Sequence, residues 1–159
     1  MEFTDYQIRS LKRKNRSHVI VNRMSGDILT TLVSILCADD EEVTIFDGRG
    51  LTDKQLLREQ LSEVQDGYIV FTHLSEIPDG QDAEIIRSLI YLCIKGDWRN
   101  AREPFFAEIW MNPLSLKSIG VIAISEGDEY KNSLDFKKMV GKGVCTYCAI
   151  NDNGYEMIE

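Results

Sequence analysis

Short apolar runs alternate with longer amphipathic runs along most of this chain, and that alternation strongly limits the folds it can adopt. The apolar runs are rich in Val and Ile, as expected of strands buried on both faces of a parallel sheet. They occupy residues 17–24, 41–48, 67–74, 118–125 and 143–151. Amphipathic helices are predicted at residues 26–39, 52–65 and 80–96. Because parallel strands need crossover connections, the pattern predicts a three-layer α/β domain with a five-stranded parallel sheet.

The chain of 159 residues is short enough to form a single domain. We expect that domain to span residues 17–159, preceded by a basic segment at residues 1–16, with no helical lid and no DNA-binding module. Residues 97–117 interrupt the alternation with Pro104 and Pro113. The aromatic side chains in and around this interruption are expected to pack locally. They are Trp98, Phe105, Phe106 and Trp110.

Charge is unevenly distributed along the sequence. Residues 1–23 carry six basic and two acidic side chains, a balance of +4, so the rest of the chain carries −12 of the total of −8. An acidic body disfavours nucleic-acid binding, except through the basic N-terminus, which is otherwise expected to be a solvated helix or tail. No apolar run is long enough to cross a membrane and no secretory signal is visible. A cytoplasmic protein without a membrane partner is therefore predicted.

The four cysteines do not form a complete metal or redox motif. Cys37 and Cys93 lie in apolar helical runs and are predicted to be buried. Cys145 and Cys148 have the C-x-x-C spacing of a redox site or half a zinc site. In a strand, however, this spacing places the two thiols on opposite faces. A structural role is preferred, with redox or metal chemistry as the alternative.

Helix N-terminal signals are weaker than the periodicity but still informative. Thr52 is the predicted N-cap of the helix at 52–65, with Asp53 placed to interact with the positive end of its dipole.

Three stretches in order resemble one protein family. They are "GYIVFTHLSEIP" (67–78), "SIGVIAISEGDEY" (118–130) and "LDFKKMVGKGVCTYCAI" (134–150). Together they resemble the AAA+ ATPase domain of sigma-54-dependent transcription activators, at its Walker B strand, its sensor strand and the arginine-finger region that follows. Gly67, Glu76 and Pro78 match that family's Walker B segment directly. The resemblance extends over residues 17–150 and implies a P-loop NTPase-like core.

The departures from the family fall on its phosphate-handling positions. In register with the family's phosphate loop, this chain has "NRMSGDIL" at residues 22–29. The degenerate phosphate-loop positions are Asn22, Arg23, Ser25, Gly26 and Asp27. Ile28 stands where the phosphate-binding lysine belongs, and Asp27 adds a negative charge beside it. Ser25 and Gly26 lie at a predicted helix N-terminus, which weakly favours anion binding. The simpler interpretation is that Asp27 itself interacts with the positive end of the helix dipole.

The metal- and water-activating positions are also replaced. Thr72 and His73 stand where the family has its Walker B carboxylates, and Glu126 stands at the sensor asparagine. The resemblance places Lys137 and Gly143 at the arginine fingers. Losing so many parts of phosphoryl transfer together predicts that the chain is not an enzyme, with no catalytic residue and no metal site. His73 then reads as a strand-end residue that makes a hydrogen bond.

The resemblance implies a regulatory role without the family's activity. Only residues 62–66 separate the second helix from the Walker B-like strand, so the loop with which the family contacts sigma-54 is absent. We predict a non-catalytic regulatory or protein-interaction domain in transcription regulation that needs no cofactor. Its partner would be another AAA+ subunit or a second copy of itself.

Two alternatives stay open at this point. The chain could bind ATP or another anion passively, through Ser25, Gly26, Arg23 and Arg16. It could instead be an unrelated enzyme that uses the cleft at the carboxyl ends of the strands, where open α/β sheets hold ligands. The groups available there are His73, Asp47, Glu76, Glu126 and the cysteines.

Overall fold

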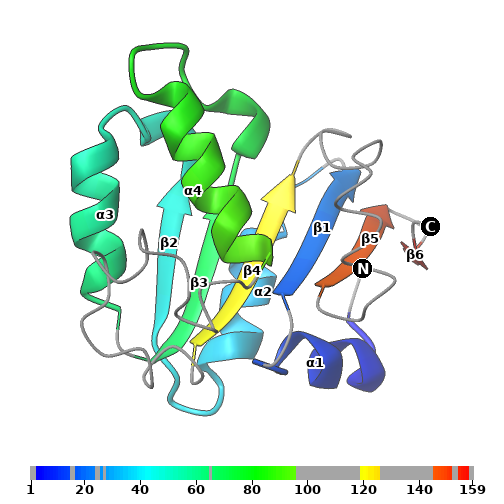
Figure 1. Ribbon diagram of the computed structural model, residues 1–159. Helices are drawn as coiled ribbons and strands as arrows, with labels where there is room; N and C mark the ends of the chain where they lie inside the picture. Colours follow the sequence, from blue (N-terminus) through cyan, green and yellow to red (C-terminus); the bar gives the residue numbers. More distant parts are fainter. Residues whose placement is uncertain are drawn as a thin grey trace.

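The computed structural model describes residues 3–14, 17–23, 26, 28–64, 66–95, 119–125, 145–151 and 154–157. Five parallel strands form the body of one sheet, in the order β2-β3-β4-β1-β5 (Figure 1). The strands are β1 (Ser17–Arg23), β2 (Val43–Asp47), β3 (Gly67–Thr72), β4 (Ile119–Ser125) and β5 (Cys145–Asn151). The predicted α/β class and five-stranded parallel sheet are confirmed.

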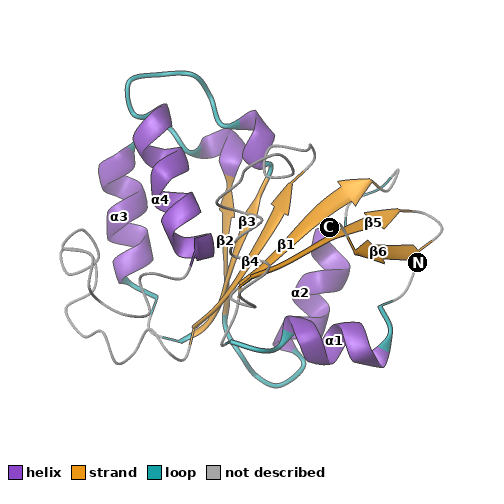
Figure 2. Ribbon diagram, turned by 45° about the vertical axis from the view of Figure 1, so that its right-hand side comes forward, coloured by secondary structure: helices purple, strands orange, loops and turns teal. Residues whose placement is uncertain are grey.

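Helices cover both faces of the sheet, giving three layers. They are α1 (Asp5–Leu11), α2 (Leu29–Cys37), α3 (Lys54–Ser62) and α4 (Ala83–Lys95), with the short 3-10 helices η1 (Gly48–Gly50) and η2 (Leu74–Glu76). Figure 2 shows α1 and α2 on one side of the sheet and α3 and α4 on the other. Because strand side chains alternate, each face of the sheet supplies its own half of the core.

The core consists of two buried clusters, one on each face. On the α3/α4 face, Leu57 and Leu61 of α3 meet the strand residues Ile69 and Phe71. On the other face, Leu32 and Leu36 of α2 pack over a second set of strand residues. These are Ile20, Tyr68, Val70, Ile122 and Ile124. β1, β3 and β4 are buried on both faces, which is why they appear in the sequence as continuous apolar runs.

A sixth strand, β6 (Gly154–Met157), was not predicted. It pairs antiparallel with β5, beginning with Asn151 opposite Gly154. Only Asp152 and Asn153 separate the two strands, and "NDNG" is a turn-forming sequence that could have signalled a hairpin. The parallel sheet thus carries one short antiparallel strand at its β5 edge.

The basic N-terminal segment contributes to the fold. Thr4 caps α1 in a reciprocal capping box with Gln7, and Leu11 is buried against the α2 face of the sheet. Lys12 pairs with Asp39 at 2.8 Å, and Lys14 pairs with Glu41 at 3.0 Å. These two lysines therefore meet carboxylates of the loop between α2 and β2.

Two local predictions need correction. Asp53, not Thr52, caps α3, because its carboxylate accepts hydrogen bonds from the amides of Gln55 and Leu56. Cys37 is exposed, not buried, since it lies on the outer side of the last turn of α2.

Cys93 is buried as predicted. Cys148 is also buried, in the cluster on the α1/α2 face, whereas the side chain of Cys145 lies outside the described residues. The predicted aromatic packing at residues 97–117 and the basic residue Arg16 also fall outside them. No described helix combines the length and apolar character needed to cross a bilayer.

Candidate functional site

The ends of β1, β3 and β4, which the resemblance aligns with the phosphate loop, the Walker B segment and the sensor strand, lie at one end of the sheet. The strand order places β4 between β1 and β3, so their carboxyl ends are neighbours (Figure 1). Val21 of β1 lies opposite Ser125, the last residue of β4. Asn22, Thr72 and Ser125 are the buried polar residues at these three strand ends. All three are neutral, so no carboxylate stands among the buried side chains at this edge in the described strands.

The turn after β1 is held by a side-chain amide. The Nδ2 group of Asn22 donates a hydrogen bond to the carbonyl oxygen of Gly26 at 3.2 Å. Arg23, the next residue, is exposed, and Gly26 has open space around the position of a Cβ atom. Ser25 and Asp27 lie outside the described residues.

Ile28, in the position of the family's lysine, is part of the hydrophobic core. It is only 3 % exposed and belongs to the same cluster as Leu32. As the N-cap of α2 it provides no side-chain hydrogen bond, and the first turn of that helix contains no acidic residue. The position is therefore built for packing, and a lysine there would have to bury its charge or displace the core.

His73 adopts a left-handed backbone conformation at the end of β3, with φ 52° and ψ 43°. This conformation is uncommon for a residue other than glycine and reverses the chain into η2. The Nδ1 atom of His73 lies 3.3 Å from the hydroxyl oxygen of Thr72. The carbonyl oxygen of His73 accepts a hydrogen bond from the amide of Glu76. The predicted hydrogen bond at this strand end is confirmed.

Asp47, from the neighbouring strand, joins this group. Asp47 lies opposite Thr72 in the pairing of β2 with β3, and the Oδ1 atom of Asp47 lies 4.0 Å from Nδ1 of His73. Gly48 allows this approach, because a Cβ there would lie 2.3 Å from the carbonyl oxygen of His73. Of the groups proposed for a cleft, Asp47 and His73 thus lie together, whereas Glu126 lies outside the described residues.

Arg49 sets the charge state of Asp47. Its guanidinium contacts the carboxylate at 2.7 Å, and its backbone amide donates to the same group at 3.0 Å. The hydrogen bond from the Arg49 side chain, aided by the charge of His73 and partly opposed by burial, lowers the pKa of Asp47 to about 2. Asp47 is therefore ionised throughout the physiological range.

The Asp47–Arg49 ion pair limits what the Asp47 carboxylate can do chemically. The Asp47 carboxylate is already paired with a guanidinium, so it is a weak proton acceptor. Across the part of the chain that the structure describes, no three His, Cys, Asp or Glu side chains are grouped to hold a metal ion.

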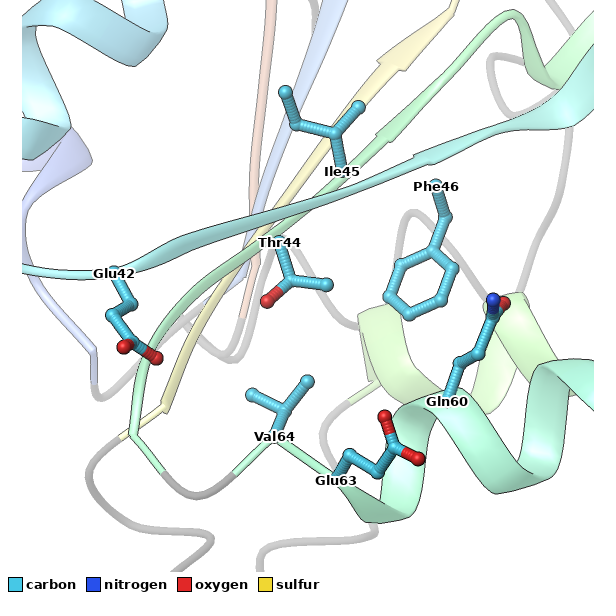
Figure 3. A pocket seen from close by; sticks show the side chains of 7 residues that line it. All are labelled: Glu42, Thr44, Ile45, Phe46, Gln60, Glu63 and Val64. Carbon is cyan, nitrogen blue, oxygen red and sulfur yellow. The ribbon is translucent and has the colours of Figure 1, made fainter.

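A second feature, missed from the sequence, is a hollow of about 320 Å³ beside β2. Figure 3 shows the side chains of Thr44 and Phe46 directed towards α3, while Ile45 points to the opposite face of the strand. The acidic side chains of Glu42 and Glu63 lie at its rim, and Val64 forms part of its floor. The sequence predicted a strand at residues 41–48, but only the strand order places β2 at an edge of the described sheet.

No protein-family model matches this chain, and a search of curated proteins found no significant match.

Proposed function

We propose that this chain is a non-catalytic AAA+-like regulatory domain that acts in transcription regulation by contacting another protein. The single observation that supports this best is the set of side chains at the ends of β1, β4 and β3. These three strand ends are neighbours, and their buried polar residues are Asn22, Ser125 and Thr72, whereas Glu126, aligned with the sensor asparagine, lies outside the described residues. Phosphoryl transfer needs a cationic side chain, a metal-binding carboxylate and a base at such a site.

The strand order adds support for the AAA+-like part of the proposal. A chain of alternating strands and helices can order its sheet in several ways, including 3-2-1-4-5-6 and 2-1-3-4-5. Here the order β2-β3-β4-β1-β5 makes neighbours of the three strands whose ends resemble the phosphate loop, the sensor and Walker B. A site inherited from an AAA+ ancestor would require the ends of these three strands to be neighbours.

Ile28 supports the non-catalytic part. Its side chain is buried with Leu32 and Leu36, so the position cannot accept lysine without loss of core packing. A buried apolar side chain at this position supports a structural role for it in place of the lysine's role.

The experiment combines turnover with capture. The purified chain is incubated with ATP and Mg²⁺, and phosphate release is followed. In parallel, the tagged chain is crosslinked to the AAA+ proteins of the cells that encode it, with ATP, with ADP and without nucleotide. We expect no phosphate release above buffer and capture of an AAA+ subunit. Phosphate release that stops in the Thr72→Ala variant, or no AAA+ protein captured in any state, would contradict the proposal.

Passive anion binding is a second candidate, favoured by the N-terminus of α2. Ile28 gives that helix no side-chain cap, its first turn contains no acid, and the exposed Arg23 lies just before the turn. Helix N-termini of this kind attract anions. Thermal unfolding with ATP or ADP tests it: ligand at a hundredfold excess over its dissociation constant stabilises by about 2.7 kcal/mol. An unchanged midpoint at millimolar nucleotide rules this candidate out.

A further inference from the structure

Among the residues that the structure describes, β2 forms one edge of the sheet. Among the described strands it pairs only with β3, so half of its main-chain N–H and C=O groups face away from the sheet. Its sequence, "VTIFD", contains neither proline nor lysine, the residues that commonly prevent an edge strand from pairing. The opposite edge is formed by β6, a strand of four residues that pairs antiparallel with β5.

The hollow beside this edge is suited to side chains from an added strand. Phe46 is 4 % exposed and Val64 is 7 % exposed, so the floor of the hollow is part of the core. On the other face of β2, Ile45 is 42 % exposed. A strand laid along β2 would direct alternate side chains into the hollow and over Ile45, since successive side chains point to opposite faces (Figure 3).

The rim of the hollow selects for positive charge. Glu42 and Glu63 lie on either side of it, and within the described residues neither carboxylate has a cationic partner. Gln60 adds a neutral polar group between them and the end of β2. The body of the chain, residues 24–159, carries a net −12. An approaching segment with Lys or Arg is therefore attracted, whereas an acidic one is repelled.

We propose that the free edge of β2, with the hollow between β2 and α3, binds an extended segment of a partner protein that alternates apolar and basic side chains. Main-chain hydrogen bonds to β2 give the binding energy of such strand addition, and the hollow gives its specificity. The inference rests on the proposed role in protein contact and specifies the surface that makes it. A second copy of the chain is a poorer occupant, because it would bring its own Glu42 and Glu63 to the same edge.

Three short peptides of about seven residues test the surface directly. One alternates Lys and Val, one alternates Glu and Val, and the third alternates Lys and Pro, which keeps the charge but removes alternate main-chain donors. Binding is followed by fluorescence anisotropy at about 50 mM and about 500 mM salt, and by amide chemical shifts. We expect only the Lys–Val peptide to bind, more weakly at high salt, with shifts concentrated in Val43–Asp47 and α3.

A matched pair of variants distinguishes the effect of charges at this surface from the effect of net charge on peptide binding. The Glu42→Lys/Glu63→Lys variant is expected to lose about tenfold in affinity for the Lys–Val peptide. The Asp79→Lys/Glu84→Lys variant changes the net charge equally at exposed positions away from β2, and should lose less than about twofold. Circular dichroism of both variants establishes that they remain folded.

Three outcomes would overturn the inference. They are equal binding of the Lys–Val and Lys–Pro peptides, equal losses in the two variants, and a concentration-dependent dimer that the Glu42→Lys/Glu63→Lys variant changes. The proposed function is judged separately by capture. If an AAA+ subunit is still captured by the Glu42→Lys/Glu63→Lys variant, protein contact stands and the β2 edge is excluded. If the peptide binds at β2 but no AAA+ subunit is captured, the edge stands and the AAA+ partner is excluded.

Discussion

The two ends of the parallel sheet use polar residues in different ways. At the amino end, the buried ring of His18 and the hydroxyl of Tyr68 bond to backbone carbonyl groups. At the carboxyl end, Asn22, Thr72 and Ser125 are also buried, but Asp47 and Arg49 form a partly exposed ion pair and His73 has a left-handed backbone. The contrast between His18 and Tyr68 on one side and Asp47 and His73 on the other separates side chains that maintain the fold from those available for function.

His18 and Tyr68 illustrate the amino end. Nε2 of His18 lies 3.3 Å from the carbonyl oxygen of Arg13 and must donate to it, so Nδ1 accepts from the hydroxyl of Thr146 at 2.8 Å. The Tyr68 hydroxyl donates to the carbonyl of Lys12, and the ammonium of Lys14 lies 5.0 Å from the ring centre. These contacts fasten the segment after α1 to β1 and β3, and through His18 to β5.

Asp47 and His73 illustrate the carboxyl end. The Asp47 side chain is 42 % exposed and the Arg49 side chain 58 %, so their ion pair is largely solvated. His73 keeps a left-handed backbone that glycine or asparagine would adopt more readily. Such solvated pairs contribute little stability, and strained residues of this kind are common at functional sites.

The largest expected effects come from one glycine at each end. Gly67→Ala should lower the free energy of unfolding by about 3 kcal/mol, because φ is +86° and the new Cβ would lie 2.2 Å from the carbonyl oxygen of Glu42. Gly48→Ala meets the His73 carbonyl at 2.3 Å and should cost about 2 kcal/mol. Urea unfolding measures both. Gly50→Ala is the control, since nothing lies within 4 Å of its Cβ.

The two histidines should respond unequally to the same substitution. His18→Asn removes a buried ring that makes two part-buried hydrogen bonds, and we expect a loss of about 2 kcal/mol. His73→Asn should change stability by less than about 0.5 kcal/mol, because asparagine tolerates the left-handed conformation. Equal losses measured by urea unfolding would mean that the carboxyl end is as structural as the amino end.

Tyr68→Phe tests the amino end of the sheet with a smaller expected loss of stability than His18→Asn. Loss of the hydrogen bond to the Lys12 carbonyl should cost about 1 kcal/mol near neutral pH. Burial, with Glu41 and Asp39 nearby, raises the pKa of Tyr68 above its usual value of 10.0. A raised pKa favours the folded state until the unfolded tyrosine ionises, so the wild type should lose its advantage as the pH rises above 10. A difference that stays constant from pH 8 to 11 would contradict this.

Asp47→Asn should also have a small effect, below about 1 kcal/mol, because the carboxylate is solvent-exposed. The pKa of Asp47 is lowered to about 2 in the folded state from 3.8. Its contribution is therefore complete above pH 4 and disappears as the pH falls towards 2. Acid titration of stability should show the two proteins converging over that interval. Arg49→Gln removes the main cause of the lowered Asp47 pKa. The stability of this variant should therefore have the same pH dependence as that of Asp47→Asn.

Local sequence patterns predicted much of the backbone. The five parallel strands and three of the helices followed from burial periodicity, because a strand covered on both faces must be apolar throughout. The pattern was less reliable where the signal was short. The four-residue β6 was missed, and the cap of α3 was placed on Thr52 when Asp53, the stronger acceptor, was one residue away.

Tertiary structure alone decided which of these residues act together. Asp47 and His73 are 26 positions apart, and they meet only because β2 and β3 pair in a register that places Asp47 opposite Thr72. Likewise, Val43–Asp47 could have been an inner strand; the strand order made it an edge, with α3 completing the hollow. Periodicity reports how deeply each segment is buried, whereas strand order and register depend on the packing of the whole chain.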